Sequence, residues 1–371
     1  MMRATMADRG TGKITIADVA KRAGVSTATA GRVLGGYGYS RQEIKDKVRQ
    51  AADELGYRPN LLARGLITGK TKTIGVVAGD IQSPFYASIL RGIADVARNA
   101  GFGVLLTNSD ERLDRELEAV QLLREKQVDG LIIAPCDPVA SPHLHAAIHD
   151  GCPVVLIDRI VENLDADSVA VDNRTASRDA IGRLIAAGHR RIGLVAELER
   201  WQRGGLDQFM DALENGSIDP LALFPSWQRL YGYLEAHRDA GLPVDRALIG
   251  RVGIYSADAA RMETRRMLQL PERPTALFTA DGLMSAAAME VITTLNLHVP
   301  TDLSLICFDD LDWMSFLKPG ITAVVQPLTE IGETAARLIL ARIEGEDGER
   351  RHLAVQPAFA ERGSIAAPRP L

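Results

Sequence analysis

Hydrophobic positions recur at helical spacing near the N-terminus and predict two short, closely connected helices within residues 15–34. In the first helix they follow the i, i+3, i+4, i+7 spacing of one buried face, and they are Ile16, Val19, Ala20 and Ala23. Gly24 favours the left-handed turn that ends a helix, and Ser26 is a suitable N-cap for the second helix. Two helices joined in this way are typical of a helix-turn-helix, but the pattern alone fits an ordinary helical pair equally well.

A third helix is predicted at residues 41–55, after a loop rich in glycine and tyrosine. Ser40 and Glu43 have the spacing of a capping box, and Gly56 ends the helix. Its apolar face can close a three-helix core and consists of Ile44, Val48, Ala51, Ala52 and Leu55. Residues 59–66 predict a further helix that is too short to be stable alone. This segment fits either a hinge that orders on a partner or a plain linker.

From residue 73 onward, apolar strands alternate with amphipathic helices. The first series of predicted strands is 73–80, 102–108, 129–135, 153–158 and 168–173, and the second is 191–196, 251–256, 275–281 and 303–310. The intervening helices are predicted at 84–100, 113–126, 142–149, 174–187, 229–240, 258–269 and 283–296. Continuous apolar strands between helices predict an α/β fold with parallel, doubly wound sheets. Two successive series predict two similar subdomains.

Polar side chains follow the strands of both series. They are Asp80, Asn108, Asp158, Asp172, Asp281 and Asp309. Because ligands of such sheets bind beyond the carboxyl ends of the strands, we expect a polar small-molecule site in the cleft between the subdomains. The same aspartates fit helix caps, so both interpretations stay open at this point.

Charge is divided unevenly along the chain. The net charge is −5, yet residues 1–70 hold 13 Lys and Arg against 6 Asp and Glu, a balance of +7. The remaining residues hold 30 against 42, a balance of −12. A basic N-terminal module on an acidic body is expected where only the small module meets phosphates.

Composition excludes several classes of protein. Hydrophobic residues make up 46% of the chain, but no apolar run reaches the roughly 18 residues of a membrane span, and no signal peptide opens the chain. A cytoplasmic protein is therefore expected. The cysteines lack a C-x-x-C spacing and are predicted to be buried thiols, and they are Cys136, Cys152 and Cys307.

Motifs for catalysis are incomplete. Residues 65–71 resemble a phosphate-binding P-loop, but Arg64 stands where the first glycine belongs and no strand precedes the segment. Three histidines lack an evident third zinc ligand and are predicted to lie on the surface, and they are His143, His145 and His149. No G-x-S-x-G elbow is present. We expect a protein that is not an enzyme and uses neither a cofactor nor a metal.

Segments along the chain resemble the LacI/GalR family of transcriptional regulators in order and spacing. They are ITIADVAKRAGVSTATAGRVL, ELGYRPNLLARGL, TKTIGVVAGDIQSPFY, VDGLIIAP, VDN, GHRRIGLV, FTAD and LSLICFDD, all within residues 14–345. The resemblance implies a DNA-binding headpiece, a hinge helix and a body similar to periplasmic sugar-binding proteins, acting as a homodimer on a palindromic operator. No apolar heptads follow Gly345, so a tetramerisation helix is not expected.

The resemblance also implies which residues meet DNA. Thr27 and Ala28 match the positions exposed to base edges, and Leu66 matches a leucine inserted into the minor groove, where an apolar wedge kinks the duplex. The full implied set is Thr15, Ser26, Thr27, Ala28, Thr29, Arg32, Tyr57, Asn60, Ala63, Arg64 and Leu66.

A second implied set binds the effector, for which a sugar or sugar phosphate is expected. It comprises Phe85, Tyr86, Asp172, Arg200, Arg229, Tyr255, Asp281 and Trp313. Carboxylates and guanidinium groups suit sugar hydroxyls, aromatic faces suit the ring, and Trp313 is expected to close over the ligand. The chain departs from the family at Gly31, where serine is usual, in the loop at 35–39, and in a longer segment between Val195 and Arg229.

The expected organisation has five parts. Residues 1–13 are a disordered tail, 14–58 the headpiece, and 59–72 the hinge helix and linker. Residues 73–173 plus 309–326 form the N-terminal effector subdomain, and 174–308 plus 327–365 the C-terminal one. The expected function is a repressor whose operator affinity is switched by a sugar-like effector. The alternative is a cytoplasmic sugar-binding or sugar-processing protein with an incidental basic module.

Overall fold

The computed structural model describes residues 14–36, 39–58, 69–198, 205–218, 223–253 and 255–369. The chain forms two compact units, Met1–Thr71 and Lys72–Leu371, and each is considered separately. The disordered tail expected at 1–13 and the hinge helix expected near 59–66 lie outside the described residues.

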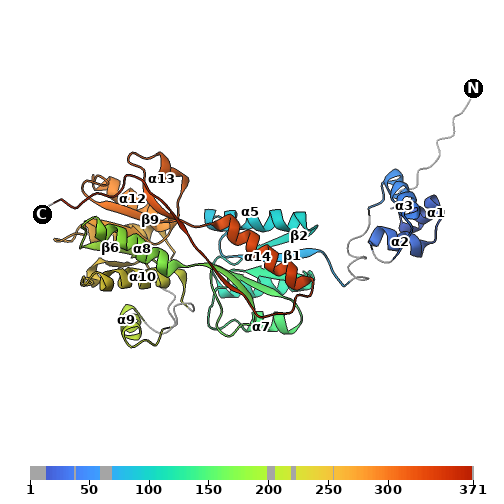
Figure 1. The fold of residues 1–371 in the computed structure, drawn as a ribbon, viewed down its shortest axis with the longest axis horizontal. Coiled ribbons are helices and arrows are strands. Elements are labelled where there is room, and N and C mark those ends of the chain that lie inside the picture. Colours follow the sequence, from blue (N-terminus) through green and yellow to red (C-terminus); the bar gives the residue numbers. More distant parts are fainter. Residues whose placement is uncertain are drawn as a thin grey trace, which may run out of the picture. The chain divides into compact units, whose positions relative to one another are not determined.

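The described residues of the first unit form a headpiece of three helices, drawn in blue in Figure 1. Its helices are α1 (Ile16–Ala23), α2 (Thr27–Gly35) and α3 (Gln42–Leu55). They enclose a small core of Val19, Ala20, Ala30, Val33, Val48, Ala51 and Ala52. Gly24 takes φ 69° at the end of α1, and this left-handed residue makes the tight turn into α2 possible. The helix-turn-helix and its core are therefore as the hydrophobic spacing predicted.

The capping box predicted for the third helix is wrong. Helix α3 begins at Gln42 with Arg41 as its N-cap, and no side chain caps it. Glu43 instead accepts a hydrogen bond from Lys47 Nζ at 2.8 Å, one turn further along the helix. Ser40 lies one residue too early in the chain to reach the first free amides.

The second unit contains two six-stranded sheets. Sheet A has the order β11 (His352–Val355), β5 (Asp167–Val171), β4 (Val154–Ile157), β3 (Gly130–Ile133), β1 (Thr73–Ala78) and β2 (Gly103–Asn108). Sheet B has the order β12 (Ala358–Ala360), β10 (Thr322–Val325), β9 (Ser304–Phe308), β8 (Ala276–Thr279), β6 (Ile192–Ala196) and β7 (Ile249–Arg251). All neighbouring strands are parallel except β12, which pairs antiparallel with β10.

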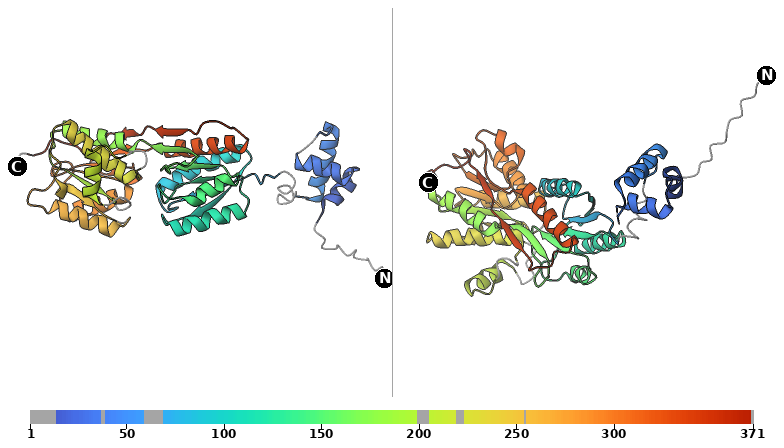
Figure 2. Two further views of the ribbon diagram at one scale, coloured as in Figure 1. Left: turned by 90° about the horizontal axis from the view of Figure 1, so that it is seen from below. Right: turned by 45° about the vertical axis from the view of Figure 1, so that its right-hand side comes forward.

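Helices cover both faces of each sheet, as expected for a doubly wound fold. Sheet A lies between the pair α5 (Pro84–Asn99) and α14 (Leu328–Ile343) and the pair α6 (Leu113–Glu125) and α7 (Pro142–His149). Sheet B lies between the pair α8 (Asn173–Ala186) and α10 (Pro225–Asp239) and the pair α11 (Ala257–Leu268) and α12 (Gly282–Thr294). Figure 2 shows the two layered halves joined by crossing segments.

In the described ranges three crossings connect the halves, and they correct the expected division of the C-terminal part. The chain passes from sheet A to sheet B after β5, returns to sheet A between β10 and α14, and crosses again between β11 and β12. Residues 309–326 therefore belong to the C-terminal half, because β10 pairs with β9. Residues 328–355 belong to the N-terminal half, because α14 packs on α5 and β11 pairs with β5. The sequence-based assignment had these two segments exchanged.

Several elements were not predicted. They are α9 (Leu206–Glu214), the 3-10 turn η2 (Arg246–Leu248), α13 (Asp312–Phe316), β10, α14, β11 and β12. Helix α9 belongs to the segment that is longer than in the resembled family. Its Phe209 is fully buried, with its ring centroid 4.8 Å from that of Trp227 on α10. The described part of this segment thus contains a helix that packs on the core of the second half.

Candidate functional site

Helix α2, the second helix of the helix-turn-helix and the expected recognition helix, presents its small side chains to solvent. Ser26 is the N-cap of α2, and its Oγ accepts a hydrogen bond from the Thr29 amide at 3.1 Å. The hydroxyls of Ser26 and Thr29 lie 2.9 Å apart, so the two side chains hold each other. Thr27 and Ala28 are exposed at the start of the helix, and Arg32 is exposed one turn later. A helix that begins with small exposed residues can approach base edges closely.

Two other residues predicted to contact DNA have structural roles in the headpiece. Thr15 forms a capping box at α1, where its amide and hydroxyl donate to Asp18 Oδ2 at 2.8 and 2.7 Å. These bonds hold the pKa of Asp18 below its usual range. Tyr57 is partly buried against the headpiece core. Four further predicted residues fall outside the described ones: Asn60, Ala63, Arg64 and Leu66.

Charged side chains from the carboxyl ends of both sheets meet in one place, which we call the inter-sheet site. It comprises Asp80, Glu111, Asp158 and Arg159 from the first half and Glu197, Arg229, Tyr255, Asp281 and Asp309 from the second. Burial raises the pKa of Asp158, and the positive charge of Arg159 lowers it. Two residues of the other half also change this pKa: Arg229 lowers it and Asp309 raises it. In the same way, the negative charge of Asp80 in the first half raises the pKa of Tyr255 in the second half.

Asp281 follows strand β8 and interacts with Arg229, Asp309 and Glu197 in this cluster. It is the N-cap of α12, and its Oδ1 accepts a hydrogen bond from the Met284 amide at 2.9 Å. Burial raises the pKa of Asp281 to about 7, against the lowering effects of that hydrogen bond and of Arg229. Near neutral pH this carboxyl therefore exists in both protonation states. It can accept or donate a hydrogen bond to a ligand hydroxyl.

Arg229 projects from α10 and is held firmly in place. It is 6% exposed, and its Nε donates to Asn173 Oδ1 at 2.9 Å, while Nη1 donates to the Ala280 carbonyl. Its guanidinium carbon lies 3.8 Å from the centre of the Phe308 ring. Asn173 was missed by the sequence analysis, although it directly follows Asp172. These contacts fix the position of the Arg229 guanidinium group at the carboxyl end of sheet B.

Two predicted effector residues lie in other environments. Asp172 caps α8, accepting from the Thr175 amide at 3.0 Å, at the first crossing between the halves. Trp313 lies on α13 and is partly buried against the core beneath α11 and α12. Its closure over a ligand stays a prediction. Arg200 lies outside the described residues.

Phe85 and Tyr86, the two aromatic residues at the start of α5, have different environments. The rings of Phe85 and Tyr86 are perpendicular, with centroids 5.0 Å apart. Tyr86 is buried, and its hydroxyl donates to Glu111 Oε1 at 2.9 Å. Phe85 is only partly buried. Phe85 is thus the better placed of the two to contact a ligand ring, whereas Tyr86 supports Glu111.

Tyr255 is 45% exposed and lies among carboxylates. Removal of its hydroxyl from water raises its pKa, and Asp281 and Asp309 raise it further. The phenol therefore stays protonated and can donate a hydrogen bond.

Glu111 and Arg159 were both missed by the sequence analysis. Arg159 follows a strand-end aspartate, Asp158, and that position was the available signal. Glu111 had no such signal, because its placement depends on a left-handed backbone, with φ 56°. Gln326 was missed as well, and its amide donates to Asp309 Oδ1 at 2.5 Å at the second crossing.

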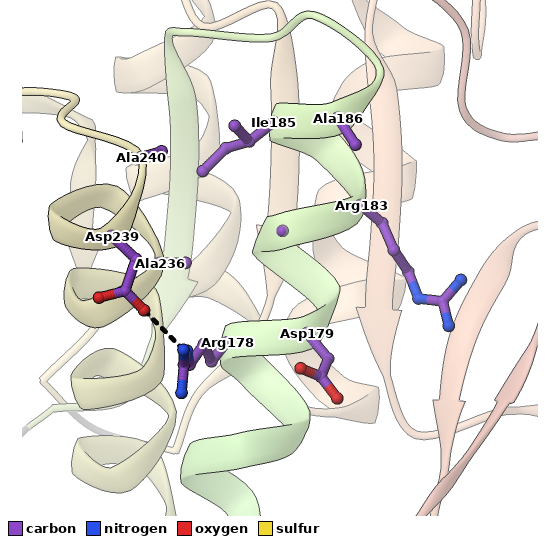
Figure 3. Close-up of a pocket in the computed structure, with 9 residues that line it drawn as sticks. Arg178, Asp179, Arg183, Ile185, Ala186, Ala236, Asp239 and Ala240 are labelled. Atoms are coloured by element: carbon purple, nitrogen blue, oxygen red, sulfur yellow. Dashed lines mark ion pairs between the residues drawn. The ribbon is translucent and has the colours of Figure 1, made fainter.

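A groove of about 650 Å³ lies elsewhere, between α8 and α10 (Figure 3). Its wall includes Arg178, which pairs with Asp239 at 2.8 Å, and Arg183, which pairs with Glu361 at 2.5 Å. None of the predicted effector residues that the structure describes lines the groove. The inter-sheet site, rather than this groove, is the candidate effector site.

No metal cluster is present among the described residues: no three His, Cys, Asp or Glu side chains are arranged to hold an ion. His143 does not lie on the surface as predicted. Its side chain is 10% exposed, and Nε2 lies 2.7 Å from the fully buried Glu116. Of the cysteines, Cys136 and Cys307 are buried as expected, whereas Cys152 is only partly so. Within the described ranges, no helix has the length and apolar composition needed to cross a bilayer.

Comparison with known proteins connects both units to one family. Residues 15–60 match the model of bacterial regulatory proteins of the lacI family, and residues 181–365 match a periplasmic binding protein-like domain. Catabolite control protein A of Priestia megaterium is 34% identical over 326 residues, which cover 88% of this chain and 91% of that protein.

Solved structures agree with this result. The lac repressor dimer bound to operator and the anti-inducer ONPF has a TM-score of 0.78 at 25% identity, covering 96% of this chain and all of that one. The complex of the transcriptional regulator CelR with cellobiose has a TM-score of 0.65 at 28% identity, covering 95% and 100%. The chain therefore belongs to the lacI family of bacterial regulatory proteins and is a DNA-binding transcriptional regulator rather than an enzyme.

Proposed function

We propose that this protein is a cytoplasmic repressor that binds a palindromic operator as a homodimer and is switched by a sugar-like effector. One observation carries the proposal: the same chain holds an exposed recognition helix and a separate site where charged and aromatic groups of two sheets converge. The solved complexes of similar regulators contain operator DNA in one case and cellobiose in the other, which supports both halves of the proposal.

In the DNA-bound state, α2 enters the major groove by its N-terminal end. Thr27 and Ala28 then face base edges, and Arg32 reaches a phosphate. The segment that contains Leu66 opens the minor groove between the two half-sites. Each headpiece reads one half-site, so the two-fold symmetry of the dimer is matched by the palindrome.

In the effector-bound state, hydroxyls of the ligand bond to Asp281 and Arg229, while Phe85 and Tyr255 cover its ring. Because these residues come from both halves, the ligand favours one relative position of the halves over the other. The three crossing segments carry that preference to the start of β1, where the chain continues from the headpiece. Coupling of this kind is typically worth about 1–3 kcal/mol.

A second copy of the chain is proposed to cover the free edge of sheet A. Strand β2 ends the sheet, and its Leu105 and Leu106 are 40% and 46% exposed. An exposed apolar edge strand favours association with another chain. Leu106→Asp is expected to convert the dimer to a monomer, measured by sedimentation equilibrium. Leu353→Asp on the opposite edge strand β11 is the matched control and should leave the dimer intact.

The test of the function is selection of bound sequences from a random duplex pool by the full-length protein, across a salt series. We expect a palindrome to be enriched and its affinity to fall steeply as salt rises. The selected duplex then serves as the probe for sugars that change the affinity. If no sequence is enriched at any salt concentration, the protein is not a sequence-specific repressor.

A further inference from the structure

The guanidinium group of Arg159 is already occupied by an internal carboxylate. Its Nη1 donates to Glu111 Oε2 at 2.6 Å, and its Nη2 donates to Glu111 Oε1 at 2.9 Å. This is the two-pronged geometry by which arginine binds carboxylates and phosphates. Nη1 also donates to the Pro135 carbonyl at 3.0 Å, and Nε lies 3.2 Å from Asp158. Glu111 therefore fills the edge of the guanidinium formed by Nη1 and Nη2, whereas the buried Nε makes no hydrogen bond.

The backbone is built to deliver Glu111 to this position. Asp110 and Glu111 are both left-handed, with φ of 49° and 56°, which is uncommon for residues other than glycine. The Glu111 amide donates to the Gly79 carbonyl at 3.1 Å. A Cβ on Gly79 would collide with the Glu111 carboxylate and the Tyr86 hydroxyl. Glycine at the end of β1 thus makes room for the carboxylate.

Side chains from both halves enclose the ion pair. The Tyr86 hydroxyl gives Glu111 Oε1 a further hydrogen bond of 2.9 Å. The Phe224 ring from the second half covers the Arg159 guanidinium, whose central carbon lies 4.9 Å from the ring centre. The side chains of Arg159 and Glu111 are 9% and 17% exposed. An ion pair so enclosed is weakly screened by water and strongly resists displacement by a dissolved anion.

The remaining charges of the inter-sheet site also disfavour an anion. The site contains several carboxylates whose charges interact electrostatically with one another or with Arg229, namely Asp158, Asp281 and Asp309. The charge of Asp80 raises the pKa of the nearby Tyr255. Among the described residues, the site thus holds more carboxylates than guanidinium groups. A phosphate or carboxylate placed there would meet like charge, whereas hydroxyls would find acceptors.

We propose that Glu111 is a built-in counter-ion that closes Arg159 to anionic ligands, so that the site selects an uncharged, hydroxyl-rich effector and rejects phosphorylated or acidic sugars. This inference rests on the proposed function, because it assumes that the effector binds between the sheets. It narrows the class of effector from sugars and sugar phosphates to sugars without an anionic group.

The first arm of the test uses the full-length wild-type protein and calorimetric titration. The probes are ribose with ribose 5-phosphate, glucose with gluconate and glucose 6-phosphate, and inorganic phosphate alone. For any neutral sugar that binds, we expect its anionic derivative to bind at least tenfold more weakly. We expect inorganic phosphate to show no saturable binding. An anion that binds as tightly as its neutral partner overturns the proposal. So does saturable phosphate binding that Arg159→Met removes.

The second arm asks whether removal of the counter-ion opens the site. Glu111→Gln keeps the shape and one acceptor but frees a buried cation, and we expect saturable phosphate binding with at least a tenfold gain over wild type. Glu118→Gln, an exposed position on α6, is the matched control and should gain nothing. The double variant Glu111→Gln/Arg159→Met should lose the gain. If Glu111→Gln folds and binds phosphate no better than wild type, Glu111 is not the counter-ion that excludes anions from Arg159.

The buried cation could prevent Glu111→Gln from folding in plain buffer. In that case the proposal predicts that phosphate raises its melting temperature in a saturable manner, beyond the effect of chloride at equal ionic strength. A variant that phosphate does not rescue contradicts the proposal. Failure of the proposed function looks different: no neutral sugar changes operator affinity, yet the phosphate titrations still decide the role of Glu111, because they require no effector.

Discussion

The recognition helix and the inter-sheet site are built in opposite ways. Thr27 and Ala28 are exposed, belong to one helix and owe their position to a cap and a turn only a few residues away. Glu111 and Arg159 are enclosed and lie 48 positions apart in the chain. The first surface can therefore change its side chains without changing the fold. In the second, each side chain is also part of the packing, so changes in function and in stability are coupled.

The largest effect of this difference is expected in the pH dependence of stability. Asp281 has a pKa of about 7 in the folded protein, against an ordinary value of 3.8. A raised carboxyl pKa means that the folded state binds the proton more tightly. The contribution of protonated Asp281 to the free energy of unfolding is fully present below about pH 4 and is lost as the pH rises through 7. The difference is at most about 4 kcal/mol, since one pKa unit corresponds to about 1.4 kcal/mol.

Asp281→Asn, which keeps a good helix cap, should remove that part of the pH dependence between pH 4 and 8. Urea unfolding followed by tryptophan fluorescence measures it, because the three tryptophans all lie in the second unit, at 201, 227 and 313. Asp18 in the headpiece provides the contrast, since its pKa is lowered by Thr15 and its contribution is lost as the pH falls. Equal pH profiles for wild type and Asp281→Asn would mean that the pKa of Asp281 is not raised in the folded protein.

Arg229→Gln is expected to weaken effector binding by about 2–3 kcal/mol, or roughly 30- to 150-fold, because hydrogen bonds of a charged group are lost in a buried place. The same change should lower the stability of the second unit, since Asn173 and the Ala280 carbonyl lose their donor. Effector titration of the operator complex and urea unfolding measure the two effects.

Arg178→Gln is the matched control for Arg229→Gln. Arg178 is 52% exposed and pairs with Asp239 at the surface groove, where an ion pair contributes about 0–1 kcal/mol. Neither effector affinity nor stability should change much. A loss of effector response in this variant, with Arg229→Gln intact, would move the effector site to the groove between α8 and α10.

The same contrast explains what could be predicted from the sequence. The headpiece was predicted because each signal is local: the spacing of Val19 and Ala20, the turn at Gly24 and the cap at Ser26 all act within a few residues. Asp281 was named both as a polar residue at a strand end and through family resemblance, whereas Arg229 was named through the resemblance alone, and both lie in the inter-sheet site. Glu111 could not be named, because its position follows from two left-handed residues and a distant arginine.

The exchange of residues 309–326 and 328–355 between the halves has a related cause. Strand β10 and helix α14 were not predicted, and no local feature of their sequences indicates which sheet each one joins. Their places are decided by long-range packing, as in the contact of α14 with α5. Periodicity predicts an element but not the sheet to which it belongs.

A variant in the recognition helix separates the effect on function from the effect on stability. Ala28→Asp places an acid in the first turn of α2, where the helix dipole favours it by about 0.3–1 kcal/mol. The same charge faces phosphates and base edges, and loss of such contacts costs about 1–3 kcal/mol in operator binding. We expect weaker operator binding, measured by fluorescence anisotropy, in a headpiece that is at least as stable as wild type. Wild-type operator affinity would mean that Ala28 does not face the DNA.

The smallest effect is expected at the cap itself. Ser26→Ala removes the acceptor for the Thr29 amide, and loss of such a cap costs about 1 kcal/mol. Hydrogen exchange of the α2 amides in the full-length protein should become several-fold faster, with a modest loss of operator affinity that follows the loss of helix. Thr27→Ala, one residue later and exposed, should leave exchange unchanged and weaken the operator complex more than Ser26→Ala does. If the two variants changed exchange and affinity in the same proportion, exposed and structural positions would not be separable even on this helix, and the contrast with the inter-sheet site would be lost.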